Sequence, residues 1–183
     1  TSSRRQRQMC IRDSYNRANP ELIKYTDNEL IEVTEYYLNE VNNLQYKITN
    51  NKNEPVKVED KFSELRKKTV NSLSATTKQF QIKNLTNHPI KISLFSTLLS
   101  YMGFSGYINP FTLEAHINKN IPKISYPFTM SHEVAHQYGI SFENEANFFG
   151  LKNTLNSNDK VINYSGKFIA LQYLLYDLSL IHI

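Results

Sequence analysis

The chain has 183 residues, of which 40% are hydrophobic and 21% are charged. These proportions are typical of a globular domain and exclude collagen-like and intrinsically disordered chains. No run of about twenty apolar residues occurs, so we expect no segment of this sequence to span a bilayer by itself. The formal net charge of +4 would favour an acidic partner such as nucleic acid, but much of it comes from the first fourteen residues.

The two ends of the chain read like a translated sequencing adapter. One adapter, read from opposite strands, encodes both MCIRDS at residues 9–14 and LSLIHI at residues 178–183, and RRQRQ continues it upstream. We therefore predict that residues 1–14 and 178–183 are artefacts and that the rest is an internal fragment of a longer protein. Without residues 1–14 the net charge is about +1, so no nucleic-acid partner is indicated. The single Cys, Cys10, lies in the excluded segment and indicates neither a disulfide nor a redox compartment.

Residues 15–83 are predicted to form a helical N-terminal part. Thr26 and Glu29 have the spacing of a capping box. A long amphipathic helix should follow, because apolar residues recur at steps of three and four: Leu30, Val33, Tyr37, Val41, Leu44 and Ile48. The polar stretch NNKNEP ends this helix, and a second helix is expected over residues 58–80. Its apolar side should consist of Phe62, Leu65, Val70 and Leu73. We interpret both helices as scaffold.

Residues 84–177 are predicted to form the core of the protein. The stretch from residue 89 to residue 106 is compatible with either a strand or a short helix. Residues 106–122 alternate in polarity and contain Gly and Pro, which predicts one or two short strands. Helical periodicity returns in residues 126–138, 141–153 and 164–177. Helices before and after a small β segment indicate the α+β class.

The sequence YPFTMSHEVAHQYG, residues 126–139, carries the strongest functional signal. Ser125 is a plausible N-cap, Pro127 suits the first helical turn, and Gly139 suits a left-handed stop. His132 and His136 are four residues apart, so their rings project from one face of the helix. Two imidazoles in this arrangement can bind one tetrahedral Zn²⁺ at about 2.0–2.1 Å.

Glu133 is rotated by about 100° from His132 on the helix. Its carboxylate is therefore expected to act as a base rather than as a ligand, by taking a proton from a water that the zinc activates and passing it to the leaving amine. A helix with two solvated His and an incidental Glu is the alternative interpretation. We disfavour it because the surrounding Val134, Ala135 and Ile140 are apolar, and uncommitted His and Glu are costly to bury.

A catalytic zinc site requires a third protein ligand, and the candidates are Glu143 and Glu145. If Ser141 caps a new helix, Glu145 lies on the border of the buried side beside Phe148 and Phe149. Glu143 lies on a more polar flank, where the dipole at a helix N-terminus would already favour an acid. We therefore prefer Glu145 over Glu143 as the third ligand and leave the choice open.

HEVAHQYGISFENEANFFG resembles an uncharacterised bacterial zincin-like family with the pattern HExAHQxG, a short gap and ExEANF. GFSGYINPFTLEAHIN, YPFTMSHE and YSGKFIALQYLL extend the resemblance over roughly residues 85–176. The ExEAN element is more distantly similar to the phage-immunity and radiation-response metallopeptidases. The resemblance implies a zincin-like fold, His132, His136 and Glu145 as ligands of Zn²⁺, and Glu133 as the catalytic residue. It also implies transmembrane helices ahead of this fragment, which would make the full-length protein membrane-associated while the fragment itself is soluble.

Three further residues are candidates for binding substrate. In zincins a strand beside the active helix binds extended substrate, and YINPFTLEAHIN is the natural candidate for that strand. Glu114 and His116 would share one face of it, although His116 stands where the family has a smaller polar residue. Tyr164 is a candidate for stabilising an oxyanion.

The function expected from the sequence is that of a zinc-dependent, gluzincin-like metallopeptidase acting on a peptide or protein. The alternative is a zinc-binding domain without turnover, which would serve as a binding or sensor module of a membrane protein.

Overall fold

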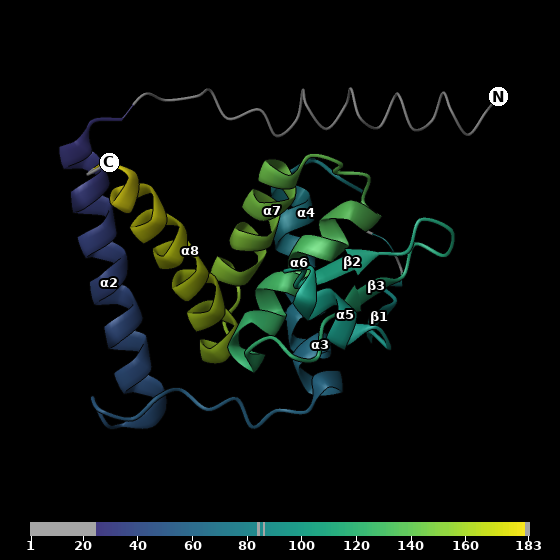
Figure 1. Ribbon diagram of the computed structural model, residues 1–183, viewed down its shortest axis with the longest axis horizontal. Coiled ribbons are helices and arrows are strands. Elements are labelled where there is room, and N and C mark those ends of the chain that lie inside the picture. Colours follow the sequence, from purple (N-terminus) through teal and green to yellow (C-terminus); the bar gives the residue numbers. More distant parts are fainter. Residues whose placement is uncertain (1–24, 84, 86, 182–183) are drawn as a thin grey trace.

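The computed structural model describes residues 25–181 except residues 84 and 86 (Figure 1). The predicted adapter segment 1–14 and residues 182–183 therefore lie outside the described residues. Within the described part, the fold is mostly helical with one three-stranded sheet, which agrees with the predicted α+β class. No helix in this part combines the length and the apolar character that a bilayer crossing requires.

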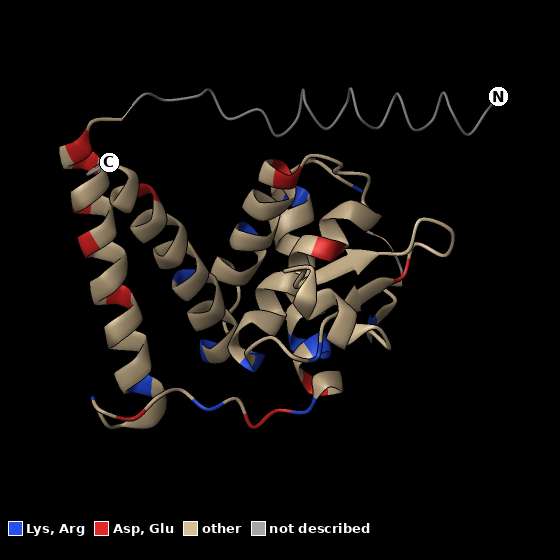
Figure 2. Ribbon diagram, viewed as in Figure 1, with Lys and Arg blue, Asp and Glu red and all other residues tan. Residues whose placement is uncertain are grey.

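Helix α2 (Asp27–Thr49) lies along α8 (Lys160–Leu180) at one side of the molecule (Figure 1). The capping box is confirmed, because Thr26 accepts from the backbone of Glu29 and donates its own N–H to the Glu29 carboxylate at 2.7 Å. A small apolar cluster joins the two helices, with Val41, Tyr164 and Leu171 buried in it. Acidic residues occur at several positions along α2 (Figure 2). The predicted apolar face is correct except at Val33, which is exposed.

The expected helix over residues 58–80 is divided into α3 (Phe62–Asn71) and α4 (Leu73–Gln79). The segment that was ambiguous between strand and helix contains both, as β1 (Ile90–Ile92) and α5 (Ser96–Tyr101). The two predicted short strands are β2 (Gly106–Ile108) and β3 (Ala115–Ile117). Leu65, Leu73 and Phe80 are buried in the same core cluster as the sheet and the later helices, so α3 and α4 pack against the predicted core instead of forming a separate unit.

The sheet has the strand order β1-β3-β2, with β3 parallel to β1 and antiparallel to β2. Ala115 and Ile117 of β3 are fully buried and point toward the core. His116 points to the opposite face because side chains alternate along a strand. It is paired in register with Tyr107 of β2. Within the described residues β2 is therefore an edge strand.

A short 3-10 turn, η1 (Lys123–Ser125), leads into α6 (Tyr126–Gln137), which carries both His residues of the motif. As predicted, Pro127 stands in its first turn and Gly139, with φ of 85°, follows its end. Helix α7 (Glu143–Leu155) then returns alongside α6. The two helices approach closely at Gly150, where a Cβ atom would lie 3.2 Å from the backbone nitrogen of His132.

One buried amide connects α7 to three other helices. Asn153 is fully buried, and its Nδ2 donates to Ser131 Oγ of α6 at 2.8 Å and to the Thr69 carbonyl of α3 at 3.2 Å. Its Oδ1 accepts from Thr76 Oγ1 of α4 at 3.2 Å. Because buried polar groups must find partners, this set of bonds fixes the relative positions of the helices that carry the site.

We expect Asn153→Ala to lower the free energy of unfolding by about 2–4 kcal/mol, because it leaves buried partners on three helices without their hydrogen bonds. Urea denaturation followed by circular dichroism measures this change. Asn156→Ala is the matched control, since Asn156 is exposed and the hydrogen bond of its side chain to Thr76 Oγ1 is long, at 3.4 Å. An equal loss in both variants would contradict the role of Asn153.

Candidate metal centre

The two imidazoles of α6 meet at their Nε2 atoms. His132 Nε2 and His136 Nε2 are 3.2 Å apart, and the rings are nearly perpendicular. Two nitrogens that each lie about 2.0–2.1 Å from one tetrahedral ion are separated by roughly 3.3–3.4 Å. The observed distance therefore suits a shared cation, and this spacing follows directly from the four-residue step of the helix.

The carboxylate of Glu143, the first residue of α7, completes the group. Its Oε2 lies 3.2 Å from His132 Nε2 and its Oε1 lies 3.5 Å from His136 Nε2. Among the described residues, His132, His136 and Glu143 form a group of side chains that could hold a metal ion. Two imidazoles and one carboxylate are a ligand set that zinc accepts, and three protein ligands leave the fourth tetrahedral position free.

The surroundings of the two rings favour donation from Nε2. His136 Nδ1 donates to the Ile140 carbonyl at 2.6 Å, which fixes the proton on Nδ1 and leaves the lone pair on Nε2. Burial lowers the pKa of His132, and the neighbouring His136 lowers it further, while Glu143 and Asn147 act in the opposite direction. A lowered pKa keeps this imidazole neutral near pH 7, which is the state that binds metals.

The structure places Glu143, and not the preferred Glu145, at the imidazoles. Helix α7 begins at Glu143, with Phe142 as its N-cap residue, one position later than a Ser141 cap assumes. Glu143 and Asn147 are four residues apart on the face toward α6, and both line the same cleft. Glu145 is buried on another side of the helix. Burial was therefore a misleading criterion, because the carboxylate that reaches both imidazoles belongs to Glu143, whose side chain is 76% exposed.

Glu133 is nearly fully buried, with 4% of its surface exposed, and its Oε2 has no hydrogen-bond partner among the described residues. Its carboxylate lies against Gly106 of β2, where a Cβ atom would be only 2.7 Å from Glu133 Oε1. The absence of a side chain at Gly106 therefore makes room for the carboxylate. Burial, followed by the charge of Glu143, raises the pKa of Glu133 to about 8. A carboxyl whose pKa lies near neutrality can both take and give a proton.

These groups line a cleft with a volume of about 1120 Å³. Strand β2 and the loop before it (residues 103–105) form one wall, α6 and α7 form the floor, and residues 169–177 of α8 form the other wall, where Tyr173 stands. The charged side chains among its lining residues are the carboxylates of Glu133, Glu143 and Asp177, without Lys or Arg in the described part of the chain. An excess of carboxylates in a confined space favours a divalent cation.

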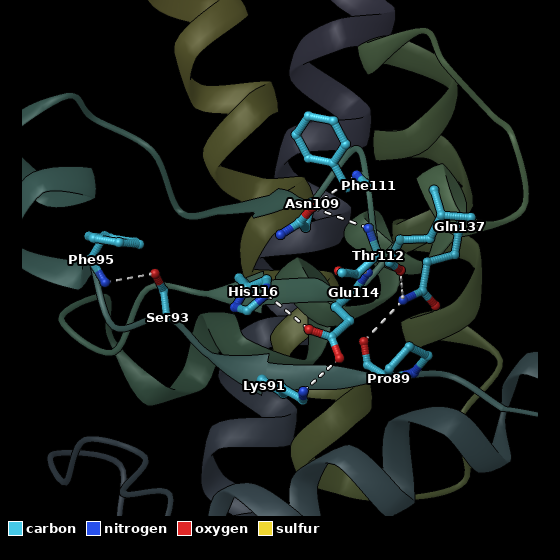
Figure 3. Close-up of polar contacts among 11 residues, drawn as sticks. Pro89, Lys91, Ser93, Phe95, Asn109, Phe111, Thr112, Glu114, His116 and Gln137 are labelled. Carbon is cyan, nitrogen blue, oxygen red and sulfur yellow. Dashed lines mark hydrogen bonds and ion pairs between the residues drawn. The ribbon is translucent and has the colours of Figure 1, made fainter.

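Glu114 and His116 lie outside this cleft. Lys91 Nζ pairs with Glu114 Oε1 at 2.6 Å, and His116 Nε2 lies 3.7 Å from Glu114 Oε2 (Figure 3). The His116 ring stacks on Tyr107, with centroids 4.9 Å apart, and Tyr107 lines the cleft. Strand β3 is the central strand, whereas β2 is an edge strand whose residues line the cleft. His116 therefore supports a wall of the cleft and does not itself face it.

Tyr164 is also not among the residues that line the cleft. It is buried between α2 and α8 and stacks on Phe168, with ring centroids 5.9 Å apart. Tyr173, which is nine residues further along α8, does face the cleft. No pattern in the sequence distinguishes them, because both lie in one apolar helix and the packing of α2 on α8 decides which face is covered.

Comparison with known proteins assigns the chain to one family. A family model described as a protein of unknown function (DUF3810) matches residues 13–180. The chain belongs to the DUF3810 family. No curated protein and no solved structure matches it. Membership of an uncharacterised family agrees with the resemblance seen in the sequence, and the match covers both the helical N-terminal part and the candidate metal centre.

If Glu143 is the third ligand, Glu143→Gln should weaken Zn²⁺ binding by at least about tenfold, because it replaces a charged donor at the cation. Isothermal titration of the metal-free protein with Zn²⁺ measures this change. Glu145→Gln is the matched control and should leave the affinity unchanged. The reverse pattern, with binding lost only in Glu145→Gln, would restore Glu145 as the ligand.

The raised pKa of Glu133 predicts how the stability of the metal-free protein depends on pH. Between the ordinary value of 4.5 and about 8, the folded state holds this proton more tightly than the unfolded state. The wild type should therefore lose stability as the pH rises through this window. Glu133→Gln should not show this loss. From pH 5 to pH 8 the free energy of unfolding of the variant should therefore rise relative to that of the wild type by as much as roughly 4 kcal/mol. Urea denaturation in the presence of a chelator measures the difference, and Glu35→Gln on the exposed side of α2 should behave as the wild type does.

Proposed function

We propose that this protein is a zinc-dependent metallopeptidase that hydrolyses peptide bonds in a protein or peptide substrate. The observation that carries the proposal is the position of the buried Glu133 carboxylate beside an open His132, His136 and Glu143 group on the floor of a cleft. A cation alone does not require a buried carboxylate with an unpartnered oxygen beside it. Hydrolysis of a peptide bond requires a group that moves a proton from water to the leaving amine, and a carboxylate in this position can do so.

The two imidazoles and the Glu143 carboxylate would hold Zn²⁺ through His132 Nε2, His136 Nε2 and an oxygen of Glu143. When bound, Zn²⁺ acts as a Lewis acid that polarises a peptide carbonyl and lowers the pKa of water. The Ile140 carbonyl, which accepts from His136 Nδ1, would keep that ring in orientation while the site is used.

Glu133 would carry the proton in the proposed reaction. Its carboxylate accepts a proton from the attacking water and then delivers it to the nitrogen of the departing amine, so the residue ends the cycle in its starting state. Gly106 supports this role by leaving space for the carboxylate. Burial raises the pKa of this carboxyl to about 8, and a nearby dication would lower it, which would favour the ionised form that accepts a proton.

Strand β2 would bind the substrate backbone. Gly106, Tyr107 and Ile108 all line the cleft, and β2 is an edge of the described sheet, so an extended peptide can add to it as a further strand. The side chains facing such a peptide would be mostly apolar or aromatic, including Phe128 of α6 and Tyr173 of α8. This lining favours substrates with large apolar side chains near the bond that is cut.

Glu133→Gln should retain Zn²⁺ and reduce peptide hydrolysis by about 10²–10⁴-fold, because the proton carrier is removed and the ligands remain. Glu143→Gln should reduce both metal content and hydrolysis. Turnover of a quenched-fluorescent peptide library together with metal analysis of the same preparations checks both results. A wild-type protein that binds zinc tightly and cleaves no member of the library would favour a zinc-binding module without turnover. Unchanged hydrolysis by Glu133→Gln would contradict the role of Glu133.

A further inference from the structure

The segment around α5 exposes an unusual number of large apolar side chains. Six of them within residues 94–104 are more than half exposed, and we call them the α5 surface: Leu94, Phe95, Leu98, Tyr101, Met102 and Phe104. Leu94 is 95% exposed and Tyr101 is 87% exposed. Single exposed apolar residues are ordinary, but a contiguous group of this kind marks a surface that contacts something else.

The polarity of this segment is partly reversed relative to an ordinary surface helix, which buries its apolar side and exposes its polar side. Leu99 is buried as expected, but Ser93 and Ser96 are buried with it, whereas Leu94, Phe95 and Leu98 are exposed. Most of the large apolar side chains of the segment therefore lie outside, where an apolar partner would cover them.

The buried polar groups of the segment are bonded within the protein. Ser96 Oγ donates to the Ser93 carbonyl at 2.7 Å and accepts from the Lys119 N–H at 3.0 Å. Asn118 Nδ2 donates to the Phe104 carbonyl at 3.0 Å. Hydrocarbon requires internal satisfaction of this kind, because it offers no hydrogen bonds. A typical protein interface instead carries about one hydrogen bond per 100–200 Å² across it.

Charge also favours a lipid surface. Residues 92–113 contain no charged side chain, so the surface carries none of the acidic groups that an anionic membrane would repel (Figure 2). Two exposed lysines, Lys119 and Lys123, follow shortly after, and the backbone of Lys119 is bonded directly to Ser96. Exposed Phe, Tyr, Leu and Met beside lysines are typical of protein surfaces that enter the headgroup region of a bilayer.

We propose that the α5 surface docks on an anionic lipid bilayer, with its apolar side chains in the interfacial region and Lys119 and Lys123 beside the headgroups. The protein would bind the bilayer peripherally, since α5 has only six residues and is too short to cross the hydrocarbon core. Gly103 and Phe104 also line the cleft, so docking brings the cleft mouth close to the membrane surface. The proposal does not depend on metal binding or on peptide hydrolysis.

Flotation of the 183-residue chain with lipid vesicles tests the proposal. The vesicles are pure phosphatidylcholine or phosphatidylcholine mixed with phosphatidylglycerol. The wild type should float with the mixed vesicles. The triple variant Leu94→Asp, Leu98→Asp, Tyr101→Asp should partition at least about tenfold less. Lys119→Glu with Lys123→Glu should reduce binding to the mixed vesicles and leave any weaker binding to pure phosphatidylcholine unchanged.

Matched controls distinguish binding through this surface from nonspecific hydrophobic binding and from the proposed enzyme activity. Ile31→Asp with Leu38→Asp places the same charges on exposed apolar positions of α2 and should float as the wild type does. Glu133→Gln should also float normally. Failure of the wild type to float, or equal loss in the α2 variant, would overturn the proposal. It would also be overturned if the α5 substitutions abolished self-association in size-exclusion chromatography, or affinity for a peptide library, while vesicle binding stayed unchanged.

Discussion

The turn between α6 and α7 is the constraint on which the candidate metal centre depends. Gly139 adopts a positive φ and ends α6, and the next residue, Ile140, bonds back to the helix through both its N–H and its carbonyl. That carbonyl accepts from His136 Nδ1, so the residue directly after the helix-ending Gly139 fixes the tautomer of a candidate ligand. Three residues later Glu143 begins α7 within reach of both rings. The same short turn therefore ends α6, orients the His136 ring and brings the Glu143 carboxylate to the imidazoles.

This local character explains how much of the site could be predicted from the sequence. The helix with His132, Glu133 and His136 was predictable because its spacing, its Pro and its terminal Gly all act within a few residues. The choice between Glu143 and Glu145 was not predictable in the same way, because it depends on where α7 starts and on how it crosses α6. The role of Gly106 depends on a contact across the fold, and no pattern in the neighbouring sequence indicates it.

The same distinction holds for the fold. The capping box at Thr26 and the short strands were read correctly, since each depends on local backbone preferences. Val33 was assigned to a buried face but is exposed, because α2 has one main partner, α8, and a single partner covers only a narrow stripe. The unpartnered Oε2 of the buried Glu133 carboxylate costs stability, whereas the buried amide of Asn153 has partners on three helices.

The two faces of helix α8 make different contacts. One face packs on α2 through Tyr164 and Leu171 and through the ion pair between Lys167 and Glu40, and the other face supplies a wall of the cleft through Tyr173. Helix α2, which does not itself line the cleft, therefore supports that wall. A chain that lacked α2 would keep His132, His136 and Glu143 but would lose the packing that holds α8 in place.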